Sequence, residues 1–585
     1  MKNRKLVASV IAVGLVASVA ASTSAGAATK TTKKKKKAVA KKPTKPAAAT
    51  TAPTTAAAPA PAPAPAAAAK SGGKLIVGME AETNNWIPGP GSWAVSGHTV
   101  SFAVYERLFG LSGKGQLSPW LADSMTADRT GLVWTIKLKK GIKFHNGEVF
   151  DANSAKANLD EAICGAVLLP VFLRINAGGA FCSKEPLPKL TRGVAVVDDS
   201  TLTVTTLAKF PGLPTAFAGQ GGVMIAPAQI KDNNGNTLIG TGPFKFKSYQ
   251  RDVALNVVKN ADYWRKDNQA KLDEIEFRPI PDENARIAQI AKGDIDITHT
   301  ANFSSKAEYD KLAKDGKAKA VSGDFMAEVN HDVLNNSIAP FNTEECRLAA
   351  AFGMDVPTLI KLKAPGARQA NGPFSPAIPG WVASSGAPTY SLDKAKANYD
   401  TCKAKLGGKD VEFTMATTND PEAGEIRDIM AAMMEKVGFN VKKANIEQSK
   451  YITTVLLGAT QWATWRYYGG IVDLDVYRFQ MHSETAAPNG GVSLNWQRAK
   501  DGQVDAAFDL LRDNTDPAVR KGAAESIFRQ YAEKAYILPR WVTVWTVAYG
   551  NKVQPNLETL KMVNGEAGPL IPFGYIVDFT NITKG

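Results

Sequence analysis

Residues 29–71 constrain the fold of this 585-residue chain more than any other segment. Nine lysines and no acid occur between Lys30 and Lys45, and an Ala/Pro/Thr-rich run follows. Neither composition can bury enough apolar surface to form a core. The Ala-Pro part favours an extended spacer of about 3.1 Å per residue. We therefore expect a disordered linker over 28–71 and a folded part from residue 72 onward, long enough for two or more domains.

The first 27 residues have the pattern of a secretory signal peptide. Three cationic residues (Lys2, Arg4 and Lys5) precede an apolar run over 6–21, and Ala25-Gly26-Ala27 fits a cleavage site. An uncleaved membrane anchor is the alternative, but the run is shorter than the roughly 20 residues of a spanning helix. The first cysteine is Cys164, far from this site. We expect an exported, extracytoplasmic protein, periplasmic or associated with the cell envelope, without a lipid anchor.

The net charge of +15 is concentrated near the N-terminus. The cationic leader residues and the nine lysines leave about +3 for the rest of the chain. That remainder offers no basic face for phosphates, so we expect no nucleic-acid partner. The Lys-rich segment could instead hold the protein to anionic cell-wall polymers or lipid head groups. A solvated leader without a partner is the alternative interpretation.

The four cysteines fit an oxidising compartment. Cys164 and Cys182 bracket a loop-like stretch, whereas Cys346 and Cys402 lie on two predicted helices. Four cysteines permit three pairings, of which we expect 164–182 and 346–402. A zinc site is the rival, but the chain has no CxxC and no cysteine lies near a histidine in the sequence.

Strand and helix signals alternate after residue 72. Trp134, Ile136 and Leu138 alternate as in a half-buried strand. A turn signal follows at Asn146-Gly147, and Asp151 is a helix cap. Residues 272–297 show the same order of strand and helix signals, with Asp282 at the start of a helix and Gly293 at its end. A further amphipathic helix is predicted within 421–439, with Gly438 past its end. This alternation predicts α/β layers.

In this order, the segments 72–88, 104–160, 240–265 and 272–297 resemble the extracellular solute-binding protein family 5, the large oligopeptide- and dipeptide-binding proteins. The resemblance covers about residues 72–585. It implies an α/β, two-lobed periplasmic-binding-protein-like fold of type II. Lobe 1 would comprise 72–322 and the return 537–585, with an extra subdomain at about 118–237, and lobe 2 would comprise 323–536. The implied function is that of a monomeric solute-binding protein that closes over a ligand and delivers it to the membrane subunits of an ABC importer.

A ligand site needs apolar walls and a few oriented polar groups. The segment 461–477 offers rigid aromatics, glycines and acids, although core packing explains part of them equally well. The resemblance also places ligand contacts there and in two loops near 93 and 381. In peptide binders an aspartate of a W-x-x-D-Y-x-x-P pattern pairs with the ligand's amino terminus; that position falls near Gly470, three residues before Asp473. The candidate residues are Trp93, Ser96, Gly97, Trp381, Trp462, Trp465, Tyr467, Tyr468, Gly470, Asp473 and Asp475.

Motifs of enzymes are missing from the sequence. It contains no P-loop, GxSxG or HExxH, and its five histidines are scattered. His145, in a turn signal, is expected to be structural. We expect no catalytic residue, cofactor or metal, and a small solute, most simply a peptide, as ligand. The alternatives are the same fold with a sugar, an opine-like compound or a metal chelate, a wall-bound hydrolase using Asp473 and Asp475, or a structural wall protein.

Overall fold

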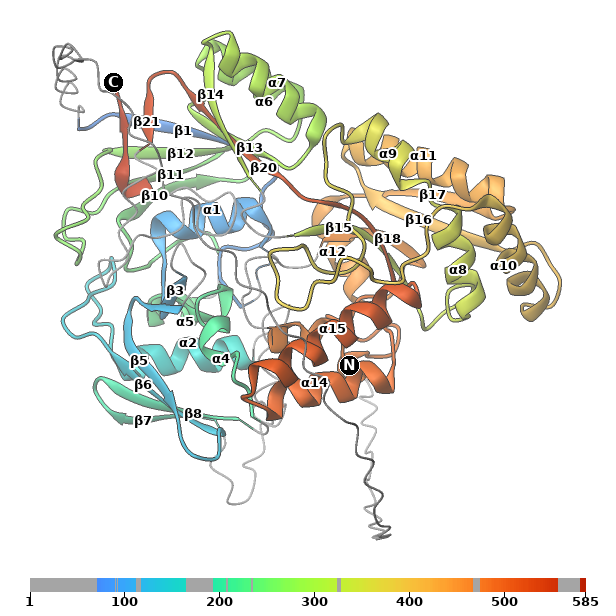
Figure 1. The fold of residues 1–585 in the computed structure, drawn as a ribbon. Coiled ribbons are helices and arrows are strands. Elements are labelled where there is room, and N and C mark those ends of the chain that lie inside the picture. Colours follow the sequence, from blue (N-terminus) through green and yellow to red (C-terminus); the bar gives the residue numbers. More distant parts are fainter. Residues whose placement is uncertain are drawn as a thin grey trace, which may run out of the picture. The chain divides into compact units, whose positions relative to one another are not determined.

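The computed structural model describes residues 71–89, 91, 93–111, 117–164, 193–206, 209–232, 235–323, 328–466, 474–555 and 579–585. Its largest sheet has seven strands; we call this sheet and the elements that pack on it the first lobe (Figure 1). β1 runs parallel to β12 and to β13, so these three strands end at the same edge of the sheet. In spatial order the strands are β10 (Phe244–Gln250), β11 (Ala254–Lys259), β12 (Glu274–Pro279), β1 (Lys74–Met79), β13 (Ile297–Thr300), β20 (Trp545–Gly550) and β14 (Ala318–Gly323).

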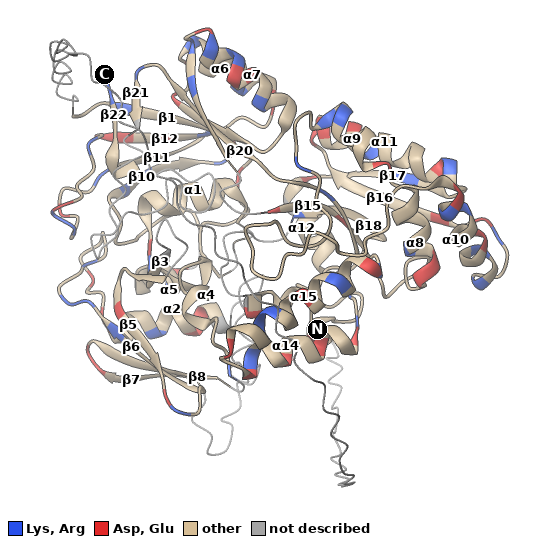
Figure 2. Cartoon of the chain, in the orientation of Figure 1, with Lys and Arg blue, Asp and Glu red and all other residues tan. Residues whose placement is uncertain are grey.

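A five-stranded sheet forms the centre of the second lobe. β16 is parallel to β17 and β18, whereas β15 is antiparallel to β18 and β19. Figure 2 shows that the strands β15, β16 and β18 are largely uncharged, while both signs of charge are spread over the helices α9, α10 and α11. The spatial order is β17 (Asn440–Ile446), β16 (Glu412–Thr418), β18 (Trp462–Arg466), β15 (Val329–Leu334) and β19 (Ile537–Val542).

The helices of the second lobe follow its strands in the chain. Apolar side chains of several of these helices are buried in the two large clusters that also contain residues of β15, β16, β18 and β19. The helices of the second lobe are α8 (Glu344–Gly353), α9 (Val356–Lys363), α10 (Leu392–Lys405), α11 (Pro421–Val437), α12 (Gln448–Leu456), α13 (Arg478–Met481), α14 (Gly502–Asp513) and α15 (Pro517–Glu533), with the 3-10 turns η2 (Leu474–Tyr477) and η3 (Ser483–Thr485).

The first lobe also carries a smaller antiparallel sheet of four strands with its own apolar cluster. Its order is β5 (Ala122–Ala127), β6 (Val133–Leu138), β8 (Thr201–Thr205) and β7 (Val194–Asp198). Three two-stranded pairs are β2 (Glu106–Arg107) with β9 (Val223–Met224), β3 (Phe109–Leu111) with β4 (Leu117–Pro119), and β21 (Val553–Pro555) with β22 (Ile582–Lys584). The helical elements are α1 (Val95–Val104), α2 (Ala152–Cys164), α4 (Leu213–Ala216), α5 (Pro227–Asp232), α6 (Glu283–Lys292), α7 (Phe303–Lys314), η1 (Gln220–Gly222) and η5 (Phe579–Asn581).

Local sequence explains where several helices begin and end. Asp151, Asp282 and Asp420 each accept a hydrogen bond from the backbone N–H three residues later, at 2.8–3.0 Å, and so cap α2, α6 and α11. Gly293 and Gly438 end α6 and α11 with φ angles of 81° and 128°. The α/β layers and these helix boundaries expected from the sequence are confirmed.

The chain changes lobe twice in the described part. It leaves the first sheet after β14 and enters the second at β15, and it returns between β19 and β20. Residues 537–542, which we expected at the start of the return to lobe 1, pair with β15 in the second sheet. The first strand back in the first sheet is β20, which starts at Trp545. The two crossings therefore lie close to residues 323–328 and 542–545.

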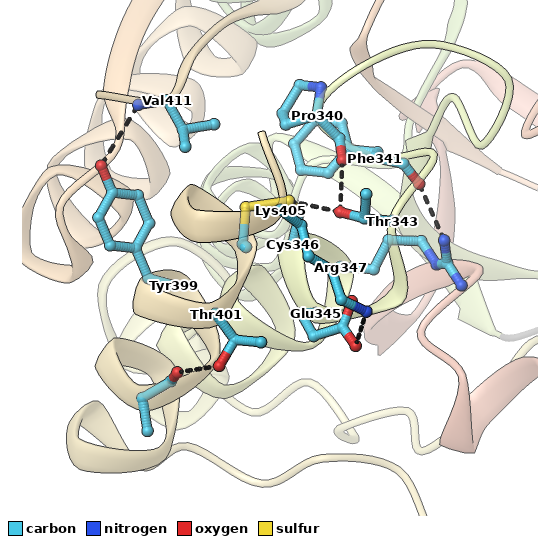
Figure 3. The surroundings of a disulfide bond; sticks show 12 residues. Pro340, Phe341, Thr343, Glu345, Cys346, Arg347, Tyr399, Thr401, Lys405 and Val411 are labelled. Atoms are coloured by element: carbon cyan, nitrogen blue, oxygen red, sulfur yellow. Dashed lines mark hydrogen bonds and ion pairs between the residues drawn. A yellow bond between two sulfur atoms is a disulfide. The ribbon is translucent and has the colours of Figure 1, made fainter. Parts of the chain in front are cut away.

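A disulfide bond joins α8 to α10 through Cys346 and Cys402, whose Cα atoms are 5.0 Å apart (Figure 3). Both cysteines are fully buried. Next to the bond, the Thr343 hydroxyl donates to the Cys346 sulfur, and the Arg347 guanidinium donates to the carbonyl of Phe341 at 2.9 Å. The expected 346–402 pairing is confirmed, whereas the 164–182 pairing stays a prediction because Cys182 lies outside the described residues.

Candidate functional site

A small recess is lined by residues of both lobes. The first lobe contributes the loop 81–84, which follows the carboxyl end of β1, together with Ala94, Ser96 and Gly97 at the start of α1. The second lobe contributes Gln448 and Ile452 of α12, which follows the carboxyl end of β17. Crevices outside the carboxyl ends of strands are the usual ligand sites of open α/β sheets. In this conformation the recess has room for about one water molecule.

The start of α1, which lines this recess, has no side-chain cap among the described residues. Ala94 at the N-cap offers no side-chain cap, and the first turn contains no acid. Ser96 is 3% exposed, and its hydroxyl has no hydrogen-bond partner in the described part of the chain. Gly97 is required for packing, because a Cβ there would lie 2.8 Å from the Cβ and Cγ of Trp93.

Glu82 is the acid that lines the recess. One of its carboxylate oxygens accepts a hydrogen bond from the backbone N–H of Asp252 at 2.9 Å. Burial raises the pKa of Glu82, and its hydrogen bonds with the Asp252 backbone and the Tyr249 hydroxyl oppose that shift. The group therefore belongs to a polar rim that the β10–β11 turn holds in place.

Charged groups from both lobes face each other near the same strand ends. The Arg466 guanidinium, at the end of β18, lies 4.8 Å from the ring centroid of Trp545 on β20. Glu80, directly after β1, lies 3.9 Å from His299 Nε2. Burial lowers the pKa of His299 to about 4, which keeps this imidazole neutral at neutral pH. Burial raises the pKa of Asp420 after β16, and the charge of Glu80 adds to the effect.

Several sequence-predicted site residues belong to the interior of the second lobe. Trp462 is 0% exposed and stacks on Phe413 at 5.5 Å between ring centroids. Asp475 is also 0% exposed, and its carboxylate accepts from Arg512 Nη2 at 3.2 Å. These two side chains therefore have packing and ion-pair roles in this conformation, and neither lines the recess.

The other candidate site aromatics among the described residues pack against neighbouring side chains or backbone. Trp93 donates to the carbonyl of Asn85 at 2.8 Å and stacks on Tyr105. Trp381 donates from its indole to Asn371 Oδ1 at 3.0 Å. Trp465 is partly exposed at the end of β18, where it lies against Trp496 with ring centroids 4.7 Å apart. A ligand contact for Trp465 stays a prediction.

Of the predicted residues that the structure describes, only Ser96 and Gly97 line the recess. Tyr467, Tyr468, Gly470 and Asp473 lie outside the described residues. The loop 81–84, Gln448 and Ile452 were not predicted from the sequence. For the loop 81–84 and Gln448, the available signal was their position shortly after a strand, because ligand crevices of α/β sheets lie outside the carboxyl ends of strands; Ile452, in the middle of α12, gave no such signal.

The described ranges contain neither a metal-binding cluster nor a membrane-spanning helix. No three His, Cys, Asp or Glu side chains there are grouped so that they could hold a metal ion. Likewise, none of the described helices combines the length and apolar character needed to cross a membrane.

Similarity to known proteins agrees with this architecture. Residues 116–489 match the model of the bacterial extracellular solute-binding proteins, family 5. The glutathione-binding protein GsiB of Pectobacterium atrosepticum is 30% identical over 311 residues, which cover 52% of this chain and 55% of that protein. The chain thus matches about half the length of this relative.

Two solved structures share the fold over 88% of this chain. DppA of Helicobacter pylori, in complex with the peptide STSA, is 20% identical with a TM-score of 0.72, and 98% of that chain is covered. AgaA of A. tumefaciens R10, in complex with agropinic acid, is 20% identical with a TM-score of 0.74, and 99% is covered. The two-lobed periplasmic-binding-protein-like fold is therefore confirmed, and the chain belongs to family 5 of the bacterial extracellular solute-binding proteins.

Proposed function

We propose that the chain is the extracytoplasmic solute-binding protein of an ABC importer and captures a small solute, most simply a peptide, between its two lobes. The observation that carries this proposal is the recess between the carboxyl ends of β1 and β17, which residues of both lobes line. A solute bound there contacts both lobes at once. It favours the closed arrangement because some of its contacts exist only after closure.

Several direct contacts between the lobes are polar, which suits reversible opening, although Phe303 of α7 is also buried in an apolar cluster of the second lobe. Besides Arg466 over Trp545, Lys209 Nζ lies 3.7 Å from Asp513, and the Arg512 guanidinium lies 5.9 Å from the ring centroid of Phe210. Exposed ion pairs contribute roughly 0–1 kcal/mol each. Contacts of this strength let a solute with modest differential affinity shift the open–closed equilibrium.

The relatives indicate two candidate classes of solute. GsiB is named as a glutathione-binding protein and DppA was solved with a peptide, which favours a peptide ligand. AgaA was solved with agropinic acid, which favours the second candidate, a non-peptide solute such as an opine-like compound, a sugar or a metal chelate. The absence of an acid at Gly470 also favours that candidate, since peptide binders pair an aspartate there with the ligand's amino terminus.

Capture of a solute fits the described acids better than hydrolysis does. A hydrolase built on Asp473 and Asp475 needs both carboxylates at a substrate. Asp475 is buried against Arg512, so its carboxylate is already neutralised and enclosed. We therefore propose a role without bond breaking.

The N-terminal segments fit the same role. We propose export by the leader with cleavage after Ala27, no lipid anchor, and retention at the cell envelope by the lysines between Lys30 and Lys45. Under this proposal the protein works as a monomer and docks on the membrane subunits of the importer. Retention by charge predicts that salt releases the protein from cell envelopes, whereas a variant with these nine lysines replaced by glutamine is released without salt.

Ligand capture and closure can be tested together. Native mass spectrometry of the purified protein should detect a retained solute, and X-ray scattering should show compaction when that solute is returned to refolded, ligand-free protein. Gln448→Trp fills the recess and should abolish compaction. Gln503→Trp, at an exposed position on α14, is the matched control and should leave it intact. Absence of any retained solute, or of compaction with every solute class, contradicts the proposal.

A further inference from the structure

The first turn of α1 lacks the cap that the sequence supplies at most other long helices. Side chains cap α6, α9, α10, α11, α14 and α15 through aspartate or serine. Glu447 accepts the backbone N–H of Lys450 and so caps α12 on the other side of the recess. At α1 the N-cap is Ala94, whose side chain cannot accept a hydrogen bond from the N–H groups of the first turn.

Ser96 is the second, independent indication of a ligand at this helix end. It lines the recess, it is 97% buried, and its hydroxyl has no partner in the described part of the chain. Leaving a buried hydroxyl unpaired is energetically unfavourable. By contrast, the hydroxyl of Thr99, one turn later, donates to the carbonyl of Val95 at 2.8 Å. A ligand that accepts a hydrogen bond from Ser96 removes this cost.

The donors at the start of α1 also favour a negative charge on the ligand group that binds there. The positive end of the helix dipole and the N–H groups of the first turn favour an anion. Glu82 opposes this, although its carboxylate is already bound to the Asp252 N–H. We propose that the first turn of α1 binds a carboxylate of the captured solute, with the N–H groups of Ser96 and Gly97 and the Ser96 hydroxyl as donors. The inference rests on the proposed capture function and names one chemical group of its solute.

Two libraries of peptides test this subsite. Mixed di- to pentapeptides with free C-terminal carboxylates compete with the same peptides made as C-terminal amides for refolded, ligand-free protein, and native mass spectrometry gives the acid/amide ratio of bound ligand. The wild-type ratio should be about tenfold or more, the usual size of a hydrogen bond to a charged group. Both libraries carry the same ammonium, so the ratio reports only the carboxylate.

Three variants separate the subsite from a structural role. Ser96→Ala should lower the acid/amide ratio severalfold, because the two backbone N–H donors remain, and it should raise the midpoint of thermal unfolding of ligand-free protein because the unpaired hydroxyl is gone. Thr99→Val, the matched control, should leave the ratio unchanged. Glu82→Gln should raise the ratio by roughly two- to fivefold by removing an opposing charge.

The outcomes distinguish failure of the carboxylate subsite from failure of the proposed solute capture. A wild-type ratio near one, or a ratio that Ser96→Ala leaves unchanged, overturns the carboxylate subsite while capture stands. The subsite is also overturned, while capture stands, if neither peptide library binds and the retained solute has no acidic group. If no solute of any class is retained and none compacts the protein, the capture function fails first.

Discussion

The hydroxyl of Ser304 on α7 donates a hydrogen bond to Glu422 Oε2 in the first turn of α11 at 2.7 Å, and so links the two lobes. Burial raises the pKa of Glu422, and the negative charges of Asp420 and Glu425 add to that shift. Opening of the lobes exposes Glu422 and brings its pKa back toward that of a solvated carboxyl. The proton is therefore bound more tightly in the closed form.

Closure of the lobes should consequently become more favourable as the pH falls. A group whose pKa is higher in one conformation favours that conformation at lower pH. X-ray scattering of ligand-free protein should show a smaller radius of gyration at pH 5 than at pH 7, and Glu422→Gln should reduce this pH dependence. Glu525→Gln, on the surface of α15, is the control. A radius of gyration that does not change with pH in the wild type contradicts the prediction.

The Cys346–Cys402 bond should contribute strongly to the stability of the second lobe. It closes a loop with a sequence separation of 56 residues, for which chain entropy predicts a contribution of about 4 kcal/mol. The double variant Cys346→Ala/Cys402→Ala should lower the free energy of unfolding in urea by up to this amount. Dithiothreitol should destabilise the wild type more than the double variant in the same assay, because the expected Cys164–Cys182 bond is present in both. Equal stability of wild type and variant would show that the bond is dispensable.

Local sequence signals were sufficient to predict much of the fold. The alternation of Trp134, Ile136 and Leu138 predicted β6, whose three side chains are all buried. Asp282 predicted the start of α6, because a cap acts on the N–H groups of the same turn. Such signals act over a few residues and survive in any tertiary context. The order of these segments then led to the family.

The candidate site was predicted less well, because its geometry depends on residues far apart in the sequence. Alternation gives a strand face but does not distinguish a ligand face from a core face, so Trp462 was placed at the ligand although it stacks on Phe413. Asp475 could not be identified as an ion-pair residue, since Arg512 lies 37 positions later. The recess joins Ser96 to Gln448, and only the folded sheets bring these together.

The ion pair of Asp475 and Arg512 should be structural. Removal of one partner leaves a buried charge, which typically costs 3–5 kcal/mol. Asp475→Ala should therefore lower the free energy of unfolding by about that much, whereas Glu525→Ala, which breaks exposed pairs, should cost under about 1 kcal/mol. Replacement of both partners, Asp475→Leu with Arg512→Met, should restore most of the loss. Native stability of Asp475→Ala, with loss of a hydrolytic activity instead, would support the hydrolase.

His145 should make the first lobe sensitive to acid. Its Nε2 lies 2.9 Å from the carbonyl of Gly242, and its Nδ1 accepts from the N–H of Gly240 at 3.2 Å, so the neutral imidazole holds this loop. Burial lowers the pKa of His145 to about 4. The stabilisation is complete above the unfolded pKa of about 6.5 and is lost as the pH falls toward 4, by about 2–3 kcal/mol at pH 4.5. Urea unfolding at pH 7 and 4.5 should show a smaller acid loss for His145→Gln; an equal loss contradicts this assignment.

Gly97 and Gly522 should respond in opposite directions to the same substitution. Both lie in helices, where alanine normally stabilises by up to about 1 kcal/mol. At Gly522 in α15 a Cβ meets nothing within 4 Å, so Gly522→Ala should be stabilising. At Gly97 the new Cβ lies 2.8 Å from Trp93, which must leave its stack on Tyr105. Gly97→Ala should therefore destabilise by about 1–3 kcal/mol, the usual cost of overpacking, and change the tryptophan fluorescence. Thermal unfolding of both variants gives the two signs, and stabilisation by Gly97→Ala would mean that Trp93 does not pack against α1.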